Sequence, residues 1–168
     1  MQQIIFRKAT IDDVMPVRQM IERRIEYLRE KDIHPSWADR DYLNVFPVEY
    51  FVGAVEKGSL YVADMEGEVL ACATLHDGDF PRWEDDGLPA YYVHNLASDP
   101  KFSGLGSEML DYCEKVAVNT GRKALRLDSI KGNAFLENFY RNKGFMFIKK
   151  TCDRGFYCTL WEKRVGEK

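Results

Sequence analysis

The stretch from Ala90 to Phe145 decides how this chain folds. It reads AYYVHNLASDP (90–100), KFSGLGSEML (101–110), a helical pattern that continues to Asn119, ALRLDSI (124–130) and GNAFLENFYRNKGF (132–145). Alternating apolar residues indicate strands, and apolar residues three and four positions apart indicate helices. The stretch therefore predicts a strand, a glycine-containing turn, a helix, a second strand and a second helix.

Gly104 and Gly106 fall where the first strand passes into the first helix. A turn of this kind can leave several backbone N–H groups unpaired at the positive end of the helix dipole, where a diphosphate binds well. A lone G-x-G is a weak motif, but its position between a strand and a helix favours a phosphate-binding turn.

The turn and the second helix resemble the two signature motifs of the GNAT family of N-acetyltransferases. The first motif, Arg/Gln-x-x-Gly-x-Gly/Ala, corresponds to Lys101-x-x-Gly104-x-Gly106. The second motif, Asn-(x)6-Tyr-(x)3-Gly-Phe, is present as Asn133, Tyr140, Gly144 and Phe145. The flanking segments also resemble the family, so the resemblance covers nearly the whole chain.

This resemblance implies a single domain over residues 1–168 with the GNAT acyl-CoA N-acyltransferase fold. That fold is α/β, with a mixed, mostly antiparallel central sheet, a V-shaped splay between two strands, and helices on both faces. The residue patterns predict the order β-α-α-β-β-β-α-β-α-β-β. Further strands are predicted at 4–6, 59–64, 69–76, 145–150 and 156–163, and further helices from Asp12 or Asp13 through Leu28 and over 48–55.

The resemblance also assigns residues to acetyl-CoA. Main-chain groups of the central strand would pair with the pantetheine arm, at Leu96, Ala97 and Ser98. N–H groups of the following turn would hold the pyrophosphate, at Phe102, Ser103, Gly104, Leu105, Gly106 and Ser107. The first motif position is filled either by Lys101 or, if the turn is two residues shorter than in many relatives, by Ser103. The second helix would add Asn133, Leu136, Phe139, Tyr140 and Lys143.

Asn133 and Tyr140 each have a structural and a functional interpretation. Asn133 directly precedes a helix, and Asn is a favoured N-cap, whereas the family places it against the cofactor. Tyr140 lies in an apolar stripe and can simply pack there. In many relatives the matching phenol lies near the CoA sulfur, and a phenol, with an ordinary pKa of about 10, can protonate the leaving thiolate as a general acid.

The general base is less clearly marked. The central strand carries no carboxylate before Asp99, so His94 is the candidate that titrates in the useful range. A histidine in a strand is more often a structural residue. The alternative is one of Glu84, Asp85 and Asp86 acting through water, although such an acidic run is usually a solvated loop.

Composition excludes several classes of protein and function. The net charge of −3 gives no reason to expect a nucleic-acid partner, and no apolar run approaches the length of a membrane span. The N-terminus lacks a signal-peptide pattern, so a cytoplasmic location is expected. Cys72, Cys113, Cys152 and Cys158 form no C-x-x-C pair, and no metal is expected. Cys152 and Cys158 flank an expected hairpin turn, where a cross-strand disulfide is geometrically conceivable.

Three functions are compatible with these observations. The leading one is transfer of the acetyl group of acetyl-CoA to a primary amine of a small molecule or peptide, by direct attack in a ternary complex without a metal. A second is a catalytically silent CoA-binding sensor or regulatory module of the same fold. A third is a nucleotide-binding α/β domain with Asp128 as the ribose ligand.

Residues 31–47 either line the acceptor pocket or cap the core with their aromatic side chains, and exposed edge strands near the C-terminus would suit a homodimer.

Overall fold

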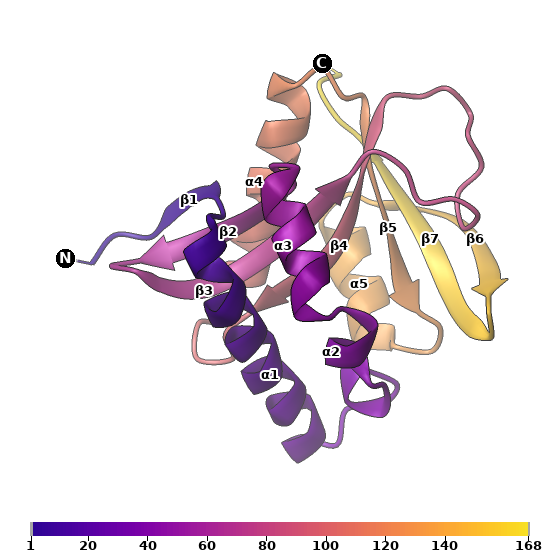
Figure 1. The fold of residues 1–168 in the computed structure, drawn as a ribbon. Coiled ribbons are helices and arrows are strands. Elements are labelled where there is room, and N and C mark those ends of the chain that lie inside the picture. Colours follow the sequence, from indigo (N-terminus) through magenta and orange to yellow (C-terminus); the bar gives the residue numbers. More distant parts are fainter. Residues whose placement is uncertain (1, 168) are drawn as a thin grey trace. The chain divides into compact units, whose positions relative to one another are not determined.

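A computed structural model describes residues 2–167, and its elements follow the predicted order (Figure 1). The strands are β1 (Ile5–Lys8), β2 (Leu60–Met65), β3 (Glu68–His76), β4 (Ala90–Ser98), β5 (Ala124–Ile130), β6 (Met146–Asp153) and β7 (Phe156–Arg164). The helices are α1 (Val14–Glu30), α2 (Tyr42–Val45), α3 (Val48–Glu56), α4 (Leu105–Asn119) and α5 (Ala134–Asn142), with short 3-10 turns at Ile11–Asp13 and Trp37–Asp39. The segment 31–47, for which no helix or strand was predicted, thus contains one short helix and a 3-10 turn.

The strands form one seven-stranded sheet in the order β1-β2-β3-β4-β5-β7-β6. The pairs β1–β2, β2–β3, β5–β7 and β6–β7 are antiparallel, whereas β4 and β5 are parallel. The parallel ladder joins Ala90–Tyr92 to Ala124–Arg126 and ends after Tyr92. The mixed, mostly antiparallel sheet predicted from the sequence is therefore confirmed. The nucleotide-binding alternative is wrong, because it requires a further parallel strand where β7 runs antiparallel to β5.

The chain divides into two compact units, and the division falls at the last residue of β3 and inside β4 and α4. The first unit contains the chain up to Leu75 together with Asn95–Tyr112, and the second contains His76–His94 together with the chain from Cys113 onward.

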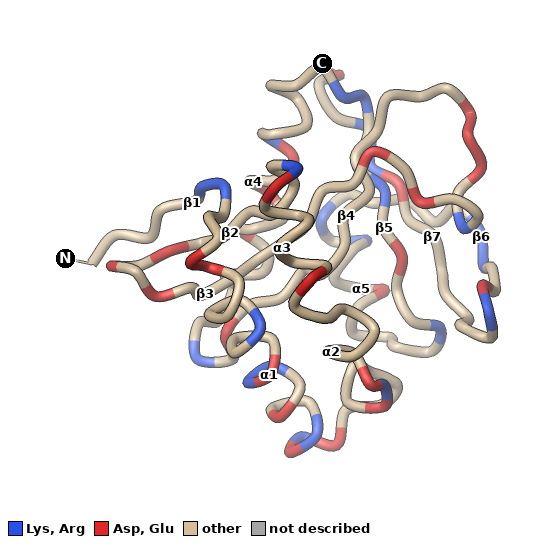
Figure 2. Tube along the Cα trace, in the orientation of Figure 1, with Lys and Arg blue, Asp and Glu red and all other residues tan. Residues whose placement is uncertain are grey.

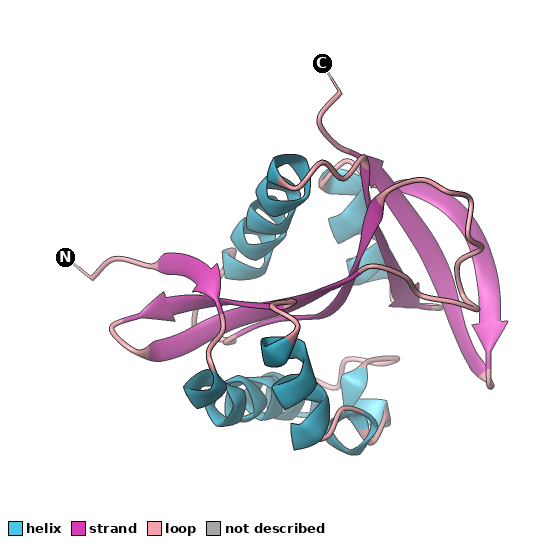
Figure 3. Ribbon diagram, turned by 45° about the horizontal axis from the view of Figure 1, so that its top comes forward, coloured by secondary structure: helices cyan, strands magenta, loops and turns pink. Residues whose placement is uncertain are grey.

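The first unit is built on β1, β2 and β3, and α1 and α3 cover the same face of these strands (Figure 3). Apolar residues of α1 recur every three or four positions and are fully buried, as at Val17 and Ile21. They pack with Phe51 of α3 and Val62 of β2. Because this periodicity is local, the sequence predicts α1 well. Acidic and basic residues both occur along the length of α1 (Figure 2).

The second unit is built on β5, β7 and β6, and Trp161 of β7 is fully buried in it. The ring of Trp161 lies 6.4 Å from that of Tyr140 on α5 and 6.2 Å from that of Phe147 on β6. The register of the β6–β7 hairpin places Cys152 opposite Tyr157 and Cys158 opposite Thr151. The conceivable Cys152–Cys158 disulfide is therefore not formed, and both thiols are free, one exposed and one buried.

Over the described residues, none of the helices combines the length and the apolar character that a membrane crossing requires.

Candidate functional site

The predicted phosphate-binding turn joins β4 to α4 within the first unit. Asp99, almost fully buried, fixes its start: the carboxylate accepts a bond from the Lys101 N–H at 3.0 Å and another from the Arg23 Nε at 2.9 Å. Gly104 has a φ of +83°, a left-handed conformation that side-chain-bearing residues adopt only at a cost. The Glu108 N–H then donates to the Gly104 carbonyl at 3.2 Å.

The first turn of α4 leaves main-chain donors for a ligand. The N–H groups of Gly106 and Ser107, in the first turn of the helix, have no main-chain partner among the described residues. The N–H of Phe102 instead donates to the Asp99 carbonyl at 3.0 Å, and that of Leu105 to the Phe102 carbonyl at 3.4 Å. The anion-binding capacity therefore lies at the glycine end of the turn, not along its whole length.

Ser98, at the end of β4, is held by Arg24 of α1. The Nε of Arg24 donates to the Ser98 carbonyl at 2.9 Å, and its Nη2 donates to Ser98 Oγ at 3.2 Å. Burial lowers the pKa of the Arg24 guanidinium. A Cβ on Gly106 would lie 3.4 Å from Ser98 Oγ, so a glycine here keeps the strand end and the helix start close together. The sequence gives no signal for this arginine, because its partner is 74 residues away.

Asn95 interrupts β4 with a φ of +56°, although it is not a glycine and is buried. Its Oδ1 accepts a hydrogen bond from the Tyr50 hydroxyl at 2.7 Å, and its Nδ2 donates to the Tyr42 hydroxyl at 2.8 Å. Its carbonyl accepts a bond from the Cys72 thiol at 3.2 Å. A left-handed residue inside a strand changes the direction of the backbone groups that follow. The sequence reasoning missed this residue.

The aromatic side chains of segment 31–47 pack against one another around Tyr42. The Trp37 and Tyr42 rings stack at 4.1 Å, and Phe46 lies 4.8 Å from Tyr42. These side chains pack against the core of the first unit. The core-capping interpretation of this segment is therefore correct for these residues, and a contact with an acceptor stays a prediction.

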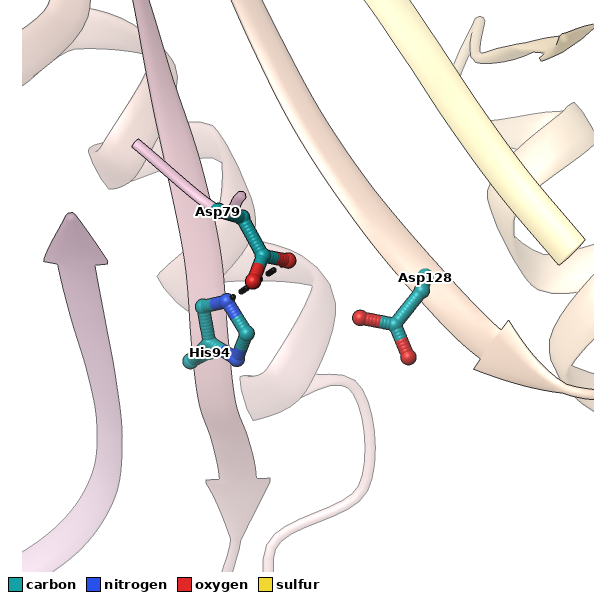
Figure 4. A group of neighbouring side chains, drawn as sticks. All are labelled: Asp79, His94 and Asp128. Atoms are coloured by element: carbon teal, nitrogen blue, oxygen red, sulfur yellow. Dashed lines mark ion pairs between the residues drawn. The ribbon is translucent and has the colours of Figure 1, made fainter. Parts of the chain in front are cut away.

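A cluster of ionisable side chains lies in the second unit and contains His94 (Figure 4). Asp79, from the segment between β3 and β4, places Oδ2 3.2 Å from the Nε2 of His94. Asp128 of β5 points its carboxylate toward the same imidazole. The Nη1 of Arg82 donates to Asp128 at 3.1 Å. The ring of His76 lies 5.1 Å from that of His94. All three residues in Figure 4 are partly buried.

The charged groups of this cluster change the pKa of Asp79. Burial alone would raise the pKa of Asp79, but the bond to His94 and the positive charges of His94 and Arg82 lower it overall. Asp79 is thus a carboxylate at neutral pH. Asp79 and Arg82 were not singled out from the sequence, and Asp128 was considered only as the ribose ligand of a nucleotide-binding domain, because no motif spacing links these positions to His94.

Tyr140 lies on the inner face of α5, and its side chain is almost fully buried. Its ring contacts those of Phe145 at 5.8 Å and Phe139 at 5.3 Å. Burial first, and then the negative charge of Asp128, raise the pKa of the Tyr140 hydroxyl. Asp128 is therefore close to both His94 and Tyr140, which are 46 residues apart in the sequence. The phenol stays protonated over the whole neutral range.

The remaining predicted residues of α5 have local roles. Asn133 is the N-cap: its Oδ1 accepts from the Leu136 N–H at 3.0 Å, which confirms the capping interpretation. Lys143 is the C-cap of the same helix. Contacts of these residues with a cofactor stay predictions.

The acidic run at 84–86 contains a structural carboxylate. Asp86 accepts from the guanidinium of the buried Arg126, with Oδ1 3.1 Å from Nη1. That bond is the main reason why the pKa of Asp86 is lowered to about 2. Asp86 is thus an exposed loop residue, as the solvated-loop interpretation expects, and its carboxylate is also bound to Arg126. Glu84 is highly exposed and lies 3.8 Å from Lys149.

The cluster could also hold a metal ion, because ligand atoms of Asp79, His94 and Asp128 all lie within 4.8 Å of one another. The guanidinium of Arg82 on Asp128 competes with a cation there. Burial raises the pKa of the Cys158 thiol, which lies near this cluster, to about 12, so this thiol is a poor ligand or nucleophile at neutral pH.

Comparisons with known proteins agree on one family. The model of the acetyltransferase (GNAT) family matches residues 18–145. The S-alkylcysteine N-acetyltransferase of Bacillus subtilis is 26% identical over 152 residues, which are 86% of this chain and 80% of that protein. A crystal structure of a GNAT-family acetyltransferase from Listeria monocytogenes superposes with a TM-score of 0.77 at 26% identity, covering 96% of this chain and 95% of the other. PaiA N-acetyltransferase from Thermoplasma acidophilum, solved with coenzyme A, gives a TM-score of 0.75 at 15% identity, covering 97% and 99%.

Proposed function

Because the chain belongs to the GNAT acetyltransferase family, we propose that it transfers the acetyl group of acetyl-CoA to a primary amine of a small molecule by direct attack in a ternary complex. The amine nitrogen attacks the thioester carbonyl and the C–S bond breaks. The nitrogen loses one proton to become the amide, and the leaving thiolate takes one. The observation that carries the proposal is that Asp128 lies beside His94 and, after burial, also contributes to the raised pKa of Tyr140, the tyrosine of the second motif.

Acetyl-CoA would bind through main-chain groups of the first unit. The N–H groups of Gly106 and Ser107, at the N-terminus of α4, suit its pyrophosphate. Leu96 and Ala97 follow the left-handed Asn95, and their main-chain groups would pair with the pantetheine amides. The Ser98 carbonyl would contribute less to pantetheine binding, because it already accepts a hydrogen bond from Arg24. The resemblance in fold to a protein solved with coenzyme A supports this assignment.

Tyr140 would donate the proton to the leaving thiolate. Its raised pKa keeps it protonated, and the same apolar surroundings would also make a thiolate more basic. Although a phenol is a weak acid in water, the Tyr140 hydroxyl can therefore donate its proton to a thiolate that is released beside it. The buried thiols of Cys113 and Cys158, with pKa values raised to about 12, do not suit an acyl-enzyme, which favours direct attack.

His94 would accept a proton from the incoming ammonium. An alkyl ammonium with an ordinary pKa near 10.4 costs about 4 kcal/mol to deprotonate at pH 7, so a base nearby lowers this cost. Glu84 and Asp85 acting through water are weaker candidates, since Glu84 is exposed, and Asp86 is bound to Arg126.

The acceptor is proposed to be the amino group of a small molecule, and an S-substituted amino acid is the first to test. The reason is the relative named as an S-alkylcysteine N-acetyltransferase, which aligns over most of this chain. Polyamines and peptide N-termini complete the panel, because the partly buried carboxylates of Asp79 and Asp128 would also attract a cationic amine.

Two measurements test the proposal. Thermal shift with acetyl-CoA, coenzyme A and NAD should show stabilisation by the first two, since a ligand that binds the folded state raises its stability by mass action. Thiol release with the amine panel should then show turnover. Stabilisation by acetyl-CoA without thiol release for any amine would favour the sensor alternative, and stabilisation by NAD alone would contradict the proposal.

A further inference from the structure

Asp79 is the closest charged partner of His94 among the described residues, and it lies on a different segment. Its Oδ2 is 3.2 Å from the histidine Nε2, and both side chains are about four-fifths buried. The carboxylate is ionised at neutral pH, because the bond to His94 lowers its pKa despite burial. An ionised carboxylate at this distance accepts the Nε2 proton, which leaves Nδ1 with the lone pair.

The other charged groups facing His94 come from three elements. Asp128 of β5 points toward the imidazole, Arg82 binds Asp128, and His76 at the end of β3 lies edge-on to His94. Because Arg82 neutralises much of the charge of Asp128, Asp79 is the carboxylate that interacts more strongly with the imidazole of His94. His76 has further interactions and adds an ionisable ring to the same cluster.

We propose that Asp79 is a positioning residue for acetyl transfer: it holds the Nε2–H of His94, so that Nδ1 accepts the proton of the acceptor ammonium. This inference rests on the proposed function. In the step, one N–H bond of the ammonium breaks and an Nδ1–H bond forms. The neutral amine then attacks the thioester, the C–S bond breaks, and the leaving thiolate takes a proton from Tyr140. The second proton, lost by the nitrogen as it becomes the amide, returns the phenol to its neutral form, and the imidazolium, stabilised by Asp79, releases its proton to water. Asp79 itself stays ionised throughout and touches neither substrate.

The test compares three variants under the same conditions. Asp79→Ala removes the contact, and Asp79→Asn keeps an oxygen acceptor without the charge. Asp77→Ala is the matched control, because Asp77 lies on the same segment, is mostly exposed and pairs instead with Arg122. Steady-state kinetics over a range of pH give kcat, the KM for acetyl-CoA and the pH profile. Thermal denaturation verifies that each variant is folded.

We expect kcat to fall about tenfold to a hundredfold in Asp79→Ala, with the KM for acetyl-CoA unchanged, since the carboxylate acts through the base. In Asp79→Asn the acid limb of the kcat profile should move to lower pH, because the imidazolium loses its counter-charge. Asp77→Ala should resemble the wild type. A merely structural role for Asp79 would lower the melting temperature but would not move the acid limb.

A measurement without turnover separates this inference from the proposed function. A histidine ring N–H held by a carboxylate gives a downfield proton resonance, which should be present in the wild type and Asp77→Ala but absent in Asp79→Ala and His94→Gln. If the wild type acetylates an amine while Asp79→Ala retains its kcat and acid limb, only the inference is overturned. If the wild type acetylates no amine, the proposed function fails and the role of Asp79 in acetyl transfer fails with it, while the resonance still shows whether Asp79 holds the Nε2–H of His94.

Discussion

The Nδ2 of Asn95 donates a hydrogen bond to the hydroxyl of Tyr42 at 2.8 Å, and through it a left-handed residue in β4 is tied to α2. Both side chains are buried. Burial, the largest effect, raises the pKa of Tyr42 well above its usual range, so this hydroxyl remains protonated and the bond does not change with pH near neutrality.

Asn95→Ala should destabilise the protein by about 2 to 4 kcal/mol. The change leaves the hydroxyls of Tyr42 and Tyr50 without this partner and puts a Cβ into a left-handed conformation. Asn95→Gly removes the same bonds but relieves the backbone cost, so it should lose about 1 kcal/mol less. Chemical denaturation of both variants measures the difference. Equal losses would show that the backbone conformation at residue 95 carries no cost.

Tyr140→Phe should lower turnover about tenfold to a thousandfold while the affinity for acetyl-CoA is retained. The substitution removes only the hydroxyl and keeps the ring against Phe145 and Trp161. Thiol-release kinetics and thermal shift with acetyl-CoA measure the two quantities. Tyr157→Phe, on the exposed surface of β7, is the matched control and should change neither. Unchanged turnover in Tyr140→Phe would remove the phenol from the mechanism.

Gly104→Ala should weaken acetyl-CoA binding at a stability cost of about 1 to 2 kcal/mol, because its φ of +83° is unfavourable for alanine. A rearranged turn would no longer direct its N–H groups at a diphosphate. Gly67, in the β2–β3 hairpin, has a φ of +90°, and at both glycines an added Cβ would meet no other atom within 4 Å. Gly67→Ala should therefore lose similar stability without losing affinity. Titration calorimetry with coenzyme A separates the two, and equal affinities would argue against the turn as the phosphate site.

Asp86→Asn should lower the melting temperature at pH 7, and its difference from the wild type should shrink as the solution is acidified. The Arg126 guanidinium lowers the pKa of Asp86 from 3.8 to about 2. A carboxyl whose pKa is lower in the folded than in the unfolded state stabilises the fold above its unfolded pKa. That contribution is lost as pH falls from about 4 toward about 2. Thermal scans along this range check it.

The neighbouring Asp85 provides the control for that series, because its carboxylate accepts the Gly87 N–H at 3.1 Å instead of a guanidinium. Asp85→Asn changes the net charge equally, and its effect should be smaller and less dependent on pH. Identical pH dependence in the two variants would show that total charge, and not the bond to Arg126, sets the effect.

Local patterns made several parts of the molecule predictable. The glycine turn before α4, the capping Asn133 and the apolar face carrying Tyr140 each depend on residues within one or two turns of each other. Helical and strand periodicities are set by backbone geometry, so they can be read without knowing the partner surface. The element order and the family resemblance followed from these patterns and were confirmed.

The long-range pairings could not be predicted. Asp79 and Asp128 both lie close to His94, and the guanidinium of Arg126 binds the carboxylate of Asp86. No spacing in the sequence links these positions. Which charge finds which partner depends on how strands are ordered and registered. That order is fixed by burial of apolar side chains over the whole chain and not by the charged residues themselves.

The sequence by itself determined the elements, the glycine turn and the tyrosine at which the family's chemistry is expected, because those depend on short-range spacing. Only the tertiary structure decided which ionisable groups lie close to His94 and Tyr140. It also decided which backbone groups already have a hydrogen-bond partner, as the Ser98 carbonyl does in Arg24. The physical reason is that electrostatic and hydrogen-bond effects depend on distance in space, which folding sets between residues far apart in the chain.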